Sequence, residues 1–316
     1  MNQTLTRKFK REMKRNITGW LFSLWPFIGY CIFSGIPFVL SIVLSFMELH
    51  SFDITTMEFV GLKNFTWIFT DPKGEFWFSL RQTFYYLLSL PIGLVLGLGM
   101  AILLNHNVKG TKLFRTILFI PNVCSVIAIS LMWRLFFSQN SGVLNTFLNF
   151  LGTDPANNID WFKDPKWFMP CVLFTTTWGA GAGSLMFQAA LAQVNKSLIE
   201  AAEIDGASNR RILFSVTLPA ISPTTFYVLV MNTISALQSF ANIQIISGGS
   251  NAPFDPATGN SIPLTTMYLI YWMGFKDPFN YGLGLASAVS WILTIFVVGL
   301  TIIYFKTSKY WVHYDE

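Results

Sequence analysis

Long apolar runs separated by short polar segments dominate this sequence, and six of the runs are long enough to cross a membrane. A membrane span needs about 20 apolar residues to cross roughly 30 Å of hydrocarbon. Backbone N–H and C=O groups in hydrocarbon have to be paired within their own segment, so each run is expected to be an α-helix. The pattern predicts an all-α membrane protein with transmembrane helices at 20–47, 79–104, 116–137, 168–190, 219–247 and 283–305.

The first run follows a basic stretch, which is also a feature of secretory signal peptides. It exceeds the roughly 7–15 residues of a signal-peptide core, and no small-x-small cleavage site closes it. We therefore expect a retained helix.

Composition agrees with a membrane protein. The 316 residues are 53% hydrophobic and 12% charged, with a mean hydropathy of +0.49, whereas soluble domains carry roughly 25% charged residues. The net charge of +5 does not indicate a nucleic-acid partner, because the basic residues flank the apolar runs and form no stripe with aromatics. Cys31, Cys124 and Cys171 fall inside apolar runs and are expected to be buried free thiols, with no metal-binding spacing.

The distribution of Lys and Arg predicts the orientation of the spans. The two ends and the loops 105–115 and 191–218 carry fourteen basic residues, against five in the loops of the opposite side. Since loops rich in Lys and Arg stay in the cytoplasm, both termini and the 191–218 loop are expected to be cytoplasmic. The expected organisation is a basic N-terminus at 1–19, one membrane domain at 20–305 and a tail at 306–316.

The loop between the fourth and fifth spans predicts two short helices joined by a turn. Ser197 and Glu200 have the spacing of a helix N-cap and its capping-box partner. Gly206 can adopt a positive φ, which ends one helix and turns the chain. A second helix at about 208–216 leads to Pro219, which is expected in the first turn of the fifth span.

The same loop resembles the EAA signature of ATP-binding-cassette (ABC) importer permeases. It reads Glu-Ala-Ala from residue 200, then three residues, a glycine, nine residues and Val-x-Leu-Pro. In that family the loop is the cytoplasmic surface that grips the ATPase. The resemblance implies that 196–219 is the coupling loop, with ATPase contacts at Glu200, Ala201, Ala202, Asp205, Gly206, Leu218 and Pro219.

The chain has no phosphate-binding loop of the G-x-x-x-x-G-K-[ST] type. ATP and Mg²⁺ are therefore expected to be bound by a separate ATPase, homodimeric or heterodimeric, and no cofactor by this chain. Catalysis here is poorly supported, because the histidines are scattered in or near loops without H-E-x-x-H or paired acidic spacing.

Three further segments resemble carbohydrate-uptake permeases of the maltose and sn-glycerol-phosphate type: 59–65 (FVGLKNF), 247–249 (SGG) and 281–288 (YGLGLASA). The first is typical of the F-like half of the permease pair. The resemblance covers nearly the whole chain and implies a type I ABC importer fold in a bacterial or archaeal plasma membrane. Its partners would be a G-like second permease and an external solute-binding protein. The insertion 251–260 departs from the family pattern and is expected to be an outer-face contact or a tolerated loop.

The outer loop between the first two spans contains the segment 62–69 (LKNFTWIF). It is interpreted either as a short amphipathic helix at the membrane interface or as residues of an aromatic belt.

No carboxylate or lysine is evident in spans two to six, which argues against a proton relay or a charged-substrate site. The hydroxyl, amide and aromatic groups of the fourth and fifth spans suit a neutral sugar. The alternative is that these groups make interhelical hydrogen bonds, each worth about 0.6–2 kcal/mol in membranes.

Alignment on the EAA glutamate with the sugar contacts of the maltose permease identifies Trp178, Gly179 and Ala182 on the fourth helix. On the fifth it identifies Asn232, Ser235, Ala236 and Ser239. Several bulky or amide groups of that site are replaced by Ala or Ser. This is expected either of a wider cavity for an oligosaccharide or of a subunit that holds no specific site and leaves selection to a binding protein. Asn232, Ser235 and Ser239 are expected to share one helix face, with Trp178 opposite.

The sequence thus predicts a non-catalytic permease subunit of an ATP-driven sugar importer. One alternative is an ABC permease for a non-sugar solute, such as a glycerol-phosphate ester or a peptide. Another is a self-contained secondary transporter, which would be expected to show inverted repeats or buried charges and would leave the EAA-like loop unexplained.

Overall fold

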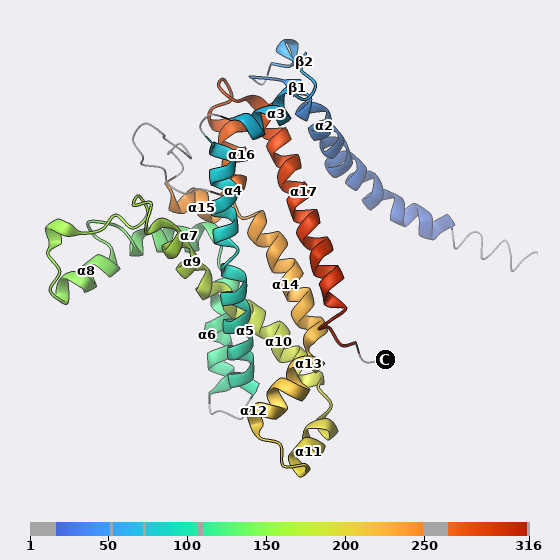
Figure 1. The fold of residues 1–316 in the computed structure, drawn as a ribbon, viewed down its shortest axis with the longest axis vertical. Helices are drawn as coiled ribbons and strands as arrows, with labels where there is room; N and C mark the ends of the chain where they lie inside the picture. Colours follow the sequence, from blue (N-terminus) through green and yellow to red (C-terminus); the bar gives the residue numbers. More distant parts are fainter. Residues whose placement is uncertain (1–16, 51–52, 72–73, 106–109, 249–264, 315–316) are drawn as a thin grey trace, which may run out of the picture. The chain divides into compact units, whose positions relative to one another are not determined.

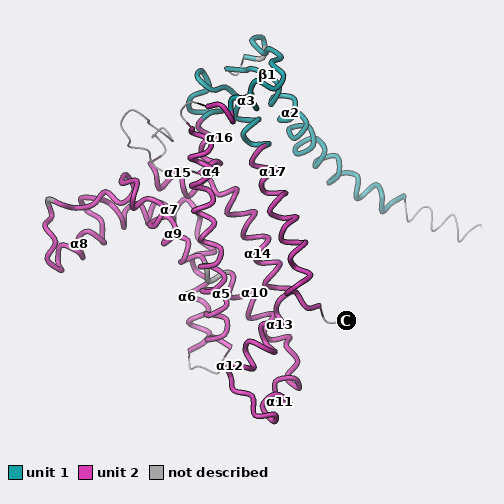
Figure 2. The backbone as a smooth tube through the Cα atoms, viewed as in Figure 1, with its two compact units in different colours: residues 1–67, 273–291 teal, residues 68–272, 292–316 magenta. Residues whose placement is uncertain are grey.

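The computed structural model describes residues 17–50, 53–71, 74–105, 110–248 and 265–314 (Figure 1). These residues are almost entirely helical, which confirms the all-α membrane class. The insertion 251–260 and most of the basic N-terminus lie outside the described residues. The chain forms two compact units, one of 1–67 with 273–291 and one of 68–272 with 292–316 (Figure 2).

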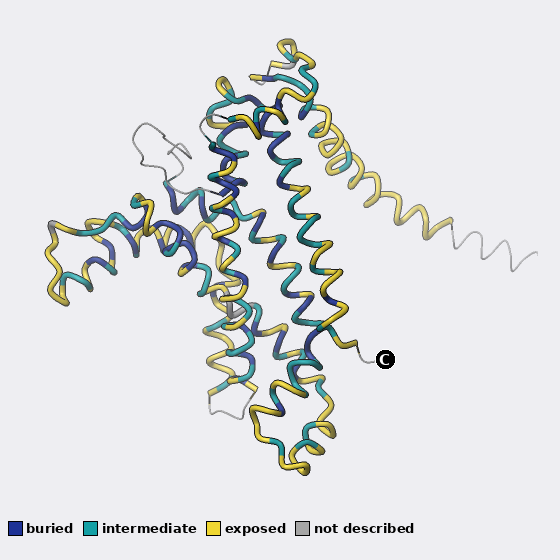
Figure 3. The backbone as a smooth tube through the Cα atoms, in the orientation of Figure 1, coloured by how far each residue is buried: buried dark blue, intermediate teal, exposed yellow. Residues whose placement is uncertain are grey.

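The first unit begins with the apolar helix Ile17–Ser45, which contains a π-helical turn, η1 (Cys31–Gly35), and ends as α2 (Ile36–Ser45). No residue of this helix before Ser45 is buried, as Figure 3 shows. A helix that is apolar all round and uncovered by its own chain requires lipid or another membrane protein around it.

The first helix leads into a small hairpin that the sequence pattern did not predict. Strand β1 (Met47–Glu48) pairs antiparallel with β2 (Glu58–Phe59), around the 3₁₀ turn η2 (Ile54–Thr56). The buried Asn64 side chain donates hydrogen bonds to the carbonyl oxygens of Ser45 and Met47, at 3.0 and 2.8 Å. Asn64 belongs to α3 (Lys63–Thr70), so the 62–69 segment is helical as one interpretation expected.

The start of α17 (Gly282–Ser308) approaches this hairpin closely enough to require glycine. A Cβ on Gly284 would lie 1.8 Å from the Met47 carbonyl oxygen. Gly282 has a φ of +85°, and the Leu283 N–H donates to the Leu49 carbonyl at 2.9 Å. The two glycines of the YGLG sequence therefore let the last long helix pack against the hairpin backbone.

The second unit contains the remaining helices. Two buried clusters hold it together, one of aromatic residues around Trp133, Phe137, Trp161 and Phe168, and one between α5, α10 and α14 around Ala101 and Phe187. Its elements are α4 (Glu75–Tyr86), α5 (Ser89–Asn105), α6 (Thr111–Val123), α7 (Val126–Phe136), α8 (Val143–Phe150), η3 (Pro155–Asn157), α9 (Phe168–Thr177), η4 (Trp178–Ala180), α10 (Gly181–Gln193), α11 (Lys196–Ile204), α12 (Asn209–Ile212), η5 (Leu213–Thr217), α13 (Leu218–Ala220), α14 (Ser222–Leu237), α15 (Ala241–Ile246), α16 (Thr266–Tyr271), η6 (Trp272–Lys276, which crosses into the first unit) and the end of α17.

All six predicted spans are helical, but three of them are interrupted. By length and hydropathy, three described helices can each cross a membrane: Ile17–Ser45, Glu75–Asn105 and Gly282–Ser308. The predicted span 116–137 consists of α6 and α7, which are bent by 99° at the extended residues Cys124 and Ser125. Pro121 in the last turn of α6 removes a backbone donor just before this break.

The predicted span 168–190 is divided into α9 and α10 by the 3₁₀ turn η4. The hydroxyls of Thr175, Thr176 and Thr177 donate to the carbonyls of Val172, Leu173 and Phe174, each at 2.7 Å. Such bonds bend helices, and the glycine-rich stretch that follows gives the backbone further freedom. The fifth predicted span likewise ends early, because α14 stops at Leu237 and α15 starts only at Ala241.

The cysteine prediction holds only in part. Cys171 is buried, whereas Cys31 and Cys124 are exposed in this chain, and all three are free thiols. Cys31 and Cys124 therefore lie on surfaces that no other described part of the chain covers.

Candidate functional sites: a polar cavity and the 196–219 loop

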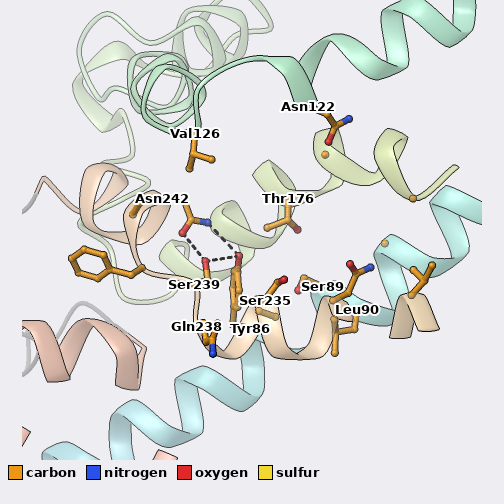
Figure 4. Close-up of a pocket in the computed structure, with 18 of the residues that line it drawn as sticks. Tyr86, Ser89, Leu90, Asn122, Val126, Thr176, Ser235, Gln238, Ser239 and Asn242 are labelled. Atoms are coloured by element: carbon orange, nitrogen blue, oxygen red, sulfur yellow. Dashed lines mark hydrogen bonds between the residues drawn. The ribbon is translucent and has the colours of Figure 1, made fainter. Parts of the chain in front are cut away.

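A cavity of about 820 Å³ lies where the helix interruptions of the second unit meet. This volume is within the range of roughly 300–1,000 Å³ that is typical of ligand sites. Among the described residues, no acidic or basic side chain lines it. Its polar lining consists of Tyr86, Ser89, Asn122, Thr176, Asn232, Ser235, Gln238, Ser239 and Asn242 (Figure 4).

Four of the sequence-predicted pathway residues border this cavity: Gly179, Asn232, Ser235 and Ser239. Ala236 also lines it, whereas the side chain of Ala182 is outside the described part. The expectation that Asn232, Ser235 and Ser239 share one helix face is correct only for the first two. Ser239 lies beyond the end of α14, in the break before α15.

Trp178 does not line this cavity opposite Asn232. Its ring packs edge-on against Trp133, with the centroids 5.2 Å apart and the planes at 85°. It lines a neighbouring cavity of about 270 Å³, which also borders Gly179 and Asn242. Trp178 is the C-cap of α9 and has helical dihedral angles, so its side chain keeps the direction that α9 gives it, which is toward Trp133 of α7.

The most specific contacts in the lining are made by Tyr86, which sequence reasoning missed, and by Asn242, which it included only among the polar groups of the fifth span. They form a triangle of hydrogen bonds with Ser239 (Figure 4). The Ser239 hydroxyl donates to Asn242 Oδ1 at 2.8 Å, and Asn242 Nδ2 donates to Tyr86 Oη at 3.2 Å. Tyr86 Oη and Ser239 Oγ are 3.3 Å apart. The signal available in the sequence was the concentration of polar residues from Gln238 to Gln244 within an apolar run.

The 196–219 loop forms the expected helix, turn and second helix. Its first helix, α11, is capped by Asn195 and not by Ser197. The Asn195 side chain accepts from the backbone N–H of Ser197 at 3.0 Å and from its hydroxyl at 2.9 Å. The capping-box prediction is therefore wrong, and Glu200 is an exposed residue within the helix.

The turn after α11 explains the spacing of the Glu-Ala-Ala-x-x-x-Gly sequence. Gly206 has a φ of +76°, and its N–H donates to the Glu203 carbonyl at 3.0 Å. The Ala207 N–H donates to the Ala202 carbonyl at 2.9 Å. These two bonds form a Schellman motif, in which the left-handed residue comes four positions after the helical carbonyl that accepts the outer bond. The predicted positive φ of Gly206 is confirmed.

The second helix of the loop starts at Ser208, whose hydroxyl accepts from the Arg211 N–H at 3.4 Å. It continues through η5 and α13 and is bent by 65° from α14. Pro219 lies before this bend, so the prediction that it begins the fifth span is wrong. Because proline has no N–H, the regular α-helical bonding cannot continue through it, and the π-helical η5 precedes it. The first turn of α14 contains Pro223 instead.

The loop also exposes apolar side chains that no sequence motif identified. Ile204 is 86% exposed at the end of α11, and Leu198 is 55% exposed. The charged residues Glu200, Asp205 and Arg210 are exposed beside them. Together these residues give the loop an exposed surface that is partly charged and partly apolar.

The family model described as "Binding-protein-dependent transport system inner membrane component" matches residues 93–308. The chain belongs to this family. The probable ABC transporter permease protein YesP of Bacillus subtilis is 37% identical over 98% of this chain and 96% of its own length. The trehalose/maltose transport system permease protein MalF of Thermococcus litoralis is 30% identical over 98% of this chain and 99% of its own length.

A solved structure has the same fold. It is the crystal structure of a bacterial alginate ABC transporter in complex with an alginate pentasaccharide-bound periplasmic protein. The TM-score is 0.78 at 22% identity, over 94% of this chain and 96% of that chain. The chain is thus a multi-pass, non-enzymatic membrane component of an ABC transport system, and the family and fold predictions are confirmed.

Proposed function

We propose that this chain is one permease half, the F-like half, of an ATP-driven importer of sugars, and of oligosaccharides in particular. The observation that carries the proposal is a cavity of about 820 Å³ in which hydroxyl and amide groups are set among apolar side chains, with no charged side chain among its described lining residues. Neutral sugars present many hydroxyls that need partners of this kind. The names of relatives that transport trehalose and maltose support the same class.

The alternatives receive less support from the cavity. A glycerol-phosphate ester or another anion would be expected to need a Lys or Arg beside it, and none of the described lining residues is basic. A self-contained secondary transporter would have no use for a docking loop, and the relatives are subunits of ABC systems.

The 196–219 loop is proposed to couple this subunit to an ATPase that binds ATP and Mg²⁺. Glu200, Ala201, Ala202, Asp205 and Gly206 would form the contact from the first helix and its turn, and Leu218 and Pro219 would set the direction of the second. The exposed Ile204 supports this role, because a side chain 86% exposed at a helix end can enter a cleft of a partner. The basic residues of this side favour a cytoplasmic loop and cytoplasmic termini.

The remaining partners follow from the same proposal. A G-like second permease would complete the pathway, and a solute-binding protein would deliver the sugar from outside. The helix Ile17–Ser45 supports a membrane partner or lipid on this face, since it is apolar and uncovered.

The test is uptake by the complete transporter in proteoliposomes, with lactose, trehalose, maltose and arabino-oligosaccharides as probes. Asn232→Leu and Ser235→Leu should reduce uptake while subunit assembly and ATP hydrolysis persist, because both change the cavity wall and not the loop. Tyr227→Leu is the control, since Tyr227 lies on α14 but does not line the cavity. If neither cavity variant alters uptake, these residues belong to helix packing and the cavity is not the sugar site.

A further inference from the structure

The three hydrogen bonds between Tyr86, Ser239 and Asn242 have only one consistent direction. The Ser239 hydroxyl has a single proton, and its shortest contact is to Asn242 Oδ1 at 2.8 Å, which can only accept. Ser239 therefore accepts from the Tyr86 hydroxyl at 3.3 Å. Tyr86 Oη in turn accepts from Asn242 Nδ2 at 3.2 Å. Each member donates once to the next, so the triangle is a closed cycle in which the bonds polarise one another.

The triangle connects two sites that are far apart in the sequence, the short turn within the long helix Glu75–Asn105 and the break between α14 and α15. Tyr86 is the last residue of α4 and precedes the turn that leads to α5. Ser239 lies in the break between α14 and α15, and Asn242 is the second residue of α15. Asn242 Oδ1 also accepts from the Ile243 N–H at 2.8 Å, so the same amide is bound to the first turn of α15. Helix breaks and turns are where a membrane helix can change direction, and here the hydrogen-bond triangle joins one of each, next to the apolar packing of the cluster that holds Tyr86, Ile243 and Ile246.

All three groups also border the cavity. Tyr86 is 5% exposed, so its hydroxyl lies at the edge of the cavity while its ring is held in the aromatic cluster with Trp133 and Phe168. A hydroxyl and an amide that already satisfy each other can exchange partners with a polyol, because a sugar hydroxyl donates and accepts as Ser239 does.

We propose that the Tyr86–Ser239–Asn242 triangle is a latch that holds the sugar-free state of the transporter and that a bound sugar opens. Tyr86 and Asn242 are then positioning residues: they hold the α4–α5 turn against the α14–α15 break until a sugar hydroxyl takes over one side of the triangle. The sugar part of this inference rests on the proposed function, whereas the latch itself does not.

The experiment uses the complete transporter in proteoliposomes and compares Tyr86→Phe with Tyr85→Phe. Both variants remove one phenolic hydroxyl from the same helix, but the Tyr85 hydroxyl makes no hydrogen bond to any described residue. Tyr86→Phe removes two sides of the triangle. ATP hydrolysis without sugar should rise at least about two- to tenfold, because the resting state loses two hydrogen bonds and the loss of one alone has an effect of that size. Tyr85→Phe should leave it unchanged.

Transport gives a second readout, with lactose, trehalose, maltose and arabino-oligosaccharides as probes. For the sugar that the wild type takes up, Tyr86→Phe should lower KM with little change in kcat, because binding no longer has to open the triangle, and stimulation of ATP hydrolysis by that sugar should fall. Ser239→Ala opens the triangle at another corner. The double variant Tyr86→Phe, Ser239→Ala should therefore hydrolyse ATP without sugar no faster than the faster single variant.

The latch would be overturned if both single variants hydrolysed ATP without sugar at the wild-type rate. It would also be overturned if the free-energy effects of the two single changes on that rate added up in the double variant. A wild type that takes up none of the sugars while Tyr86→Phe still hydrolyses ATP faster would instead refute the sugar proposal and leave the latch standing. The two proposals therefore fail separately.

Discussion

Gly206 offers a sharp test of the coupling loop, because a substitution there would strain the backbone without creating a side-chain clash. Its φ is +76°, and a Cβ at this position would meet nothing within 4 Å. A substitution therefore creates no clash, and its whole cost comes from the left-handed backbone. That cost is about 1–2 kcal/mol for an ordinary L-residue and about 1–3 kcal/mol for a residue held in a sparsely populated region.

The strain should act on docking more than on folding. Relaxation of the turn breaks the Ala207-to-Ala202 and Gly206-to-Glu203 bonds, which frees the end of α11 and displaces Ile204. Since about 1.4 kcal/mol is a factor of ten, the Kd for the ATPase should rise about fivefold to tenfold or more in Gly206→Ala and up to about a hundredfold in Gly206→Val. Gly206→Asn is the matched control, because Asn tolerates the left-handed region.

The assay is binding of the purified ATPase to the permease complex, beside sugar-stimulated ATP hydrolysis in proteoliposomes. The expected order of affinity is Gly, then Asn, then Ala, then Val. If Gly206→Val binds the ATPase and couples hydrolysis to transport as the wild type does, the turn does not set the docking geometry. The loop would then lose its proposed role.

Two further predictions concern the first unit. Gly284→Ala should lower the melting temperature of the purified complex, because its Cβ would lie 1.8 Å from the Met47 carbonyl oxygen. Such overpacking costs about 1–3 kcal/mol. The control is Gly299→Ala on the same helix, which should be neutral because a Cβ there meets nothing within 4 Å. The pKa of Glu48 lies below its ordinary value of 4.5, because the carboxylate accepts from Lys63 Nζ at 2.6 Å and contacts His50 Nε2 at 2.7 Å. The stabilisation is therefore complete above that ordinary value and is lost as the pH falls through the lower folded pKa. This stabilisation is under about 1 kcal/mol for so exposed a pair. The melting temperature should therefore fall slightly as the pH decreases, and Glu48→Gln should abolish that fall. An identical pH dependence in the variant would contradict this prediction.

The long helices could be predicted because hydropathy depends on the sum over many residues. Ile17–Ser45 and Gly282–Ser308 lie within a few residues of their predicted ends. The turn at Gly206 was also predictable, since a Schellman motif needs a glycine at a fixed distance from the helix end. These features are encoded locally and strongly.

The interruptions depend on weaker and competing preferences. Three consecutive threonines favour back-bonding to carbonyls, but the same residues fit a continuous membrane helix, so the turn at Trp178 was not evident. The spacing to Glu200 led to the prediction of Ser197 as the N-cap, but Asn195 is about as good a capping residue and is the one that caps α11. Tyr86 was missed because its partner Asn242 is 156 residues away, a contact that only the fold creates.

The interrupted helices also have a consequence for hydration. The breaks at 124–125, 178–180 and 238–240 leave peptide groups outside regular helical bonding, and residues at or next to each of them border the two polar cavities. A peptide group without a partner costs several kcal/mol in hydrocarbon, so irregular backbone at membrane depth is stable only beside solvent or polar protein groups. These three breaks should therefore exchange their amide protons for deuterium well before the uninterrupted middle of α17 does, which would outline the path of water into the subunit.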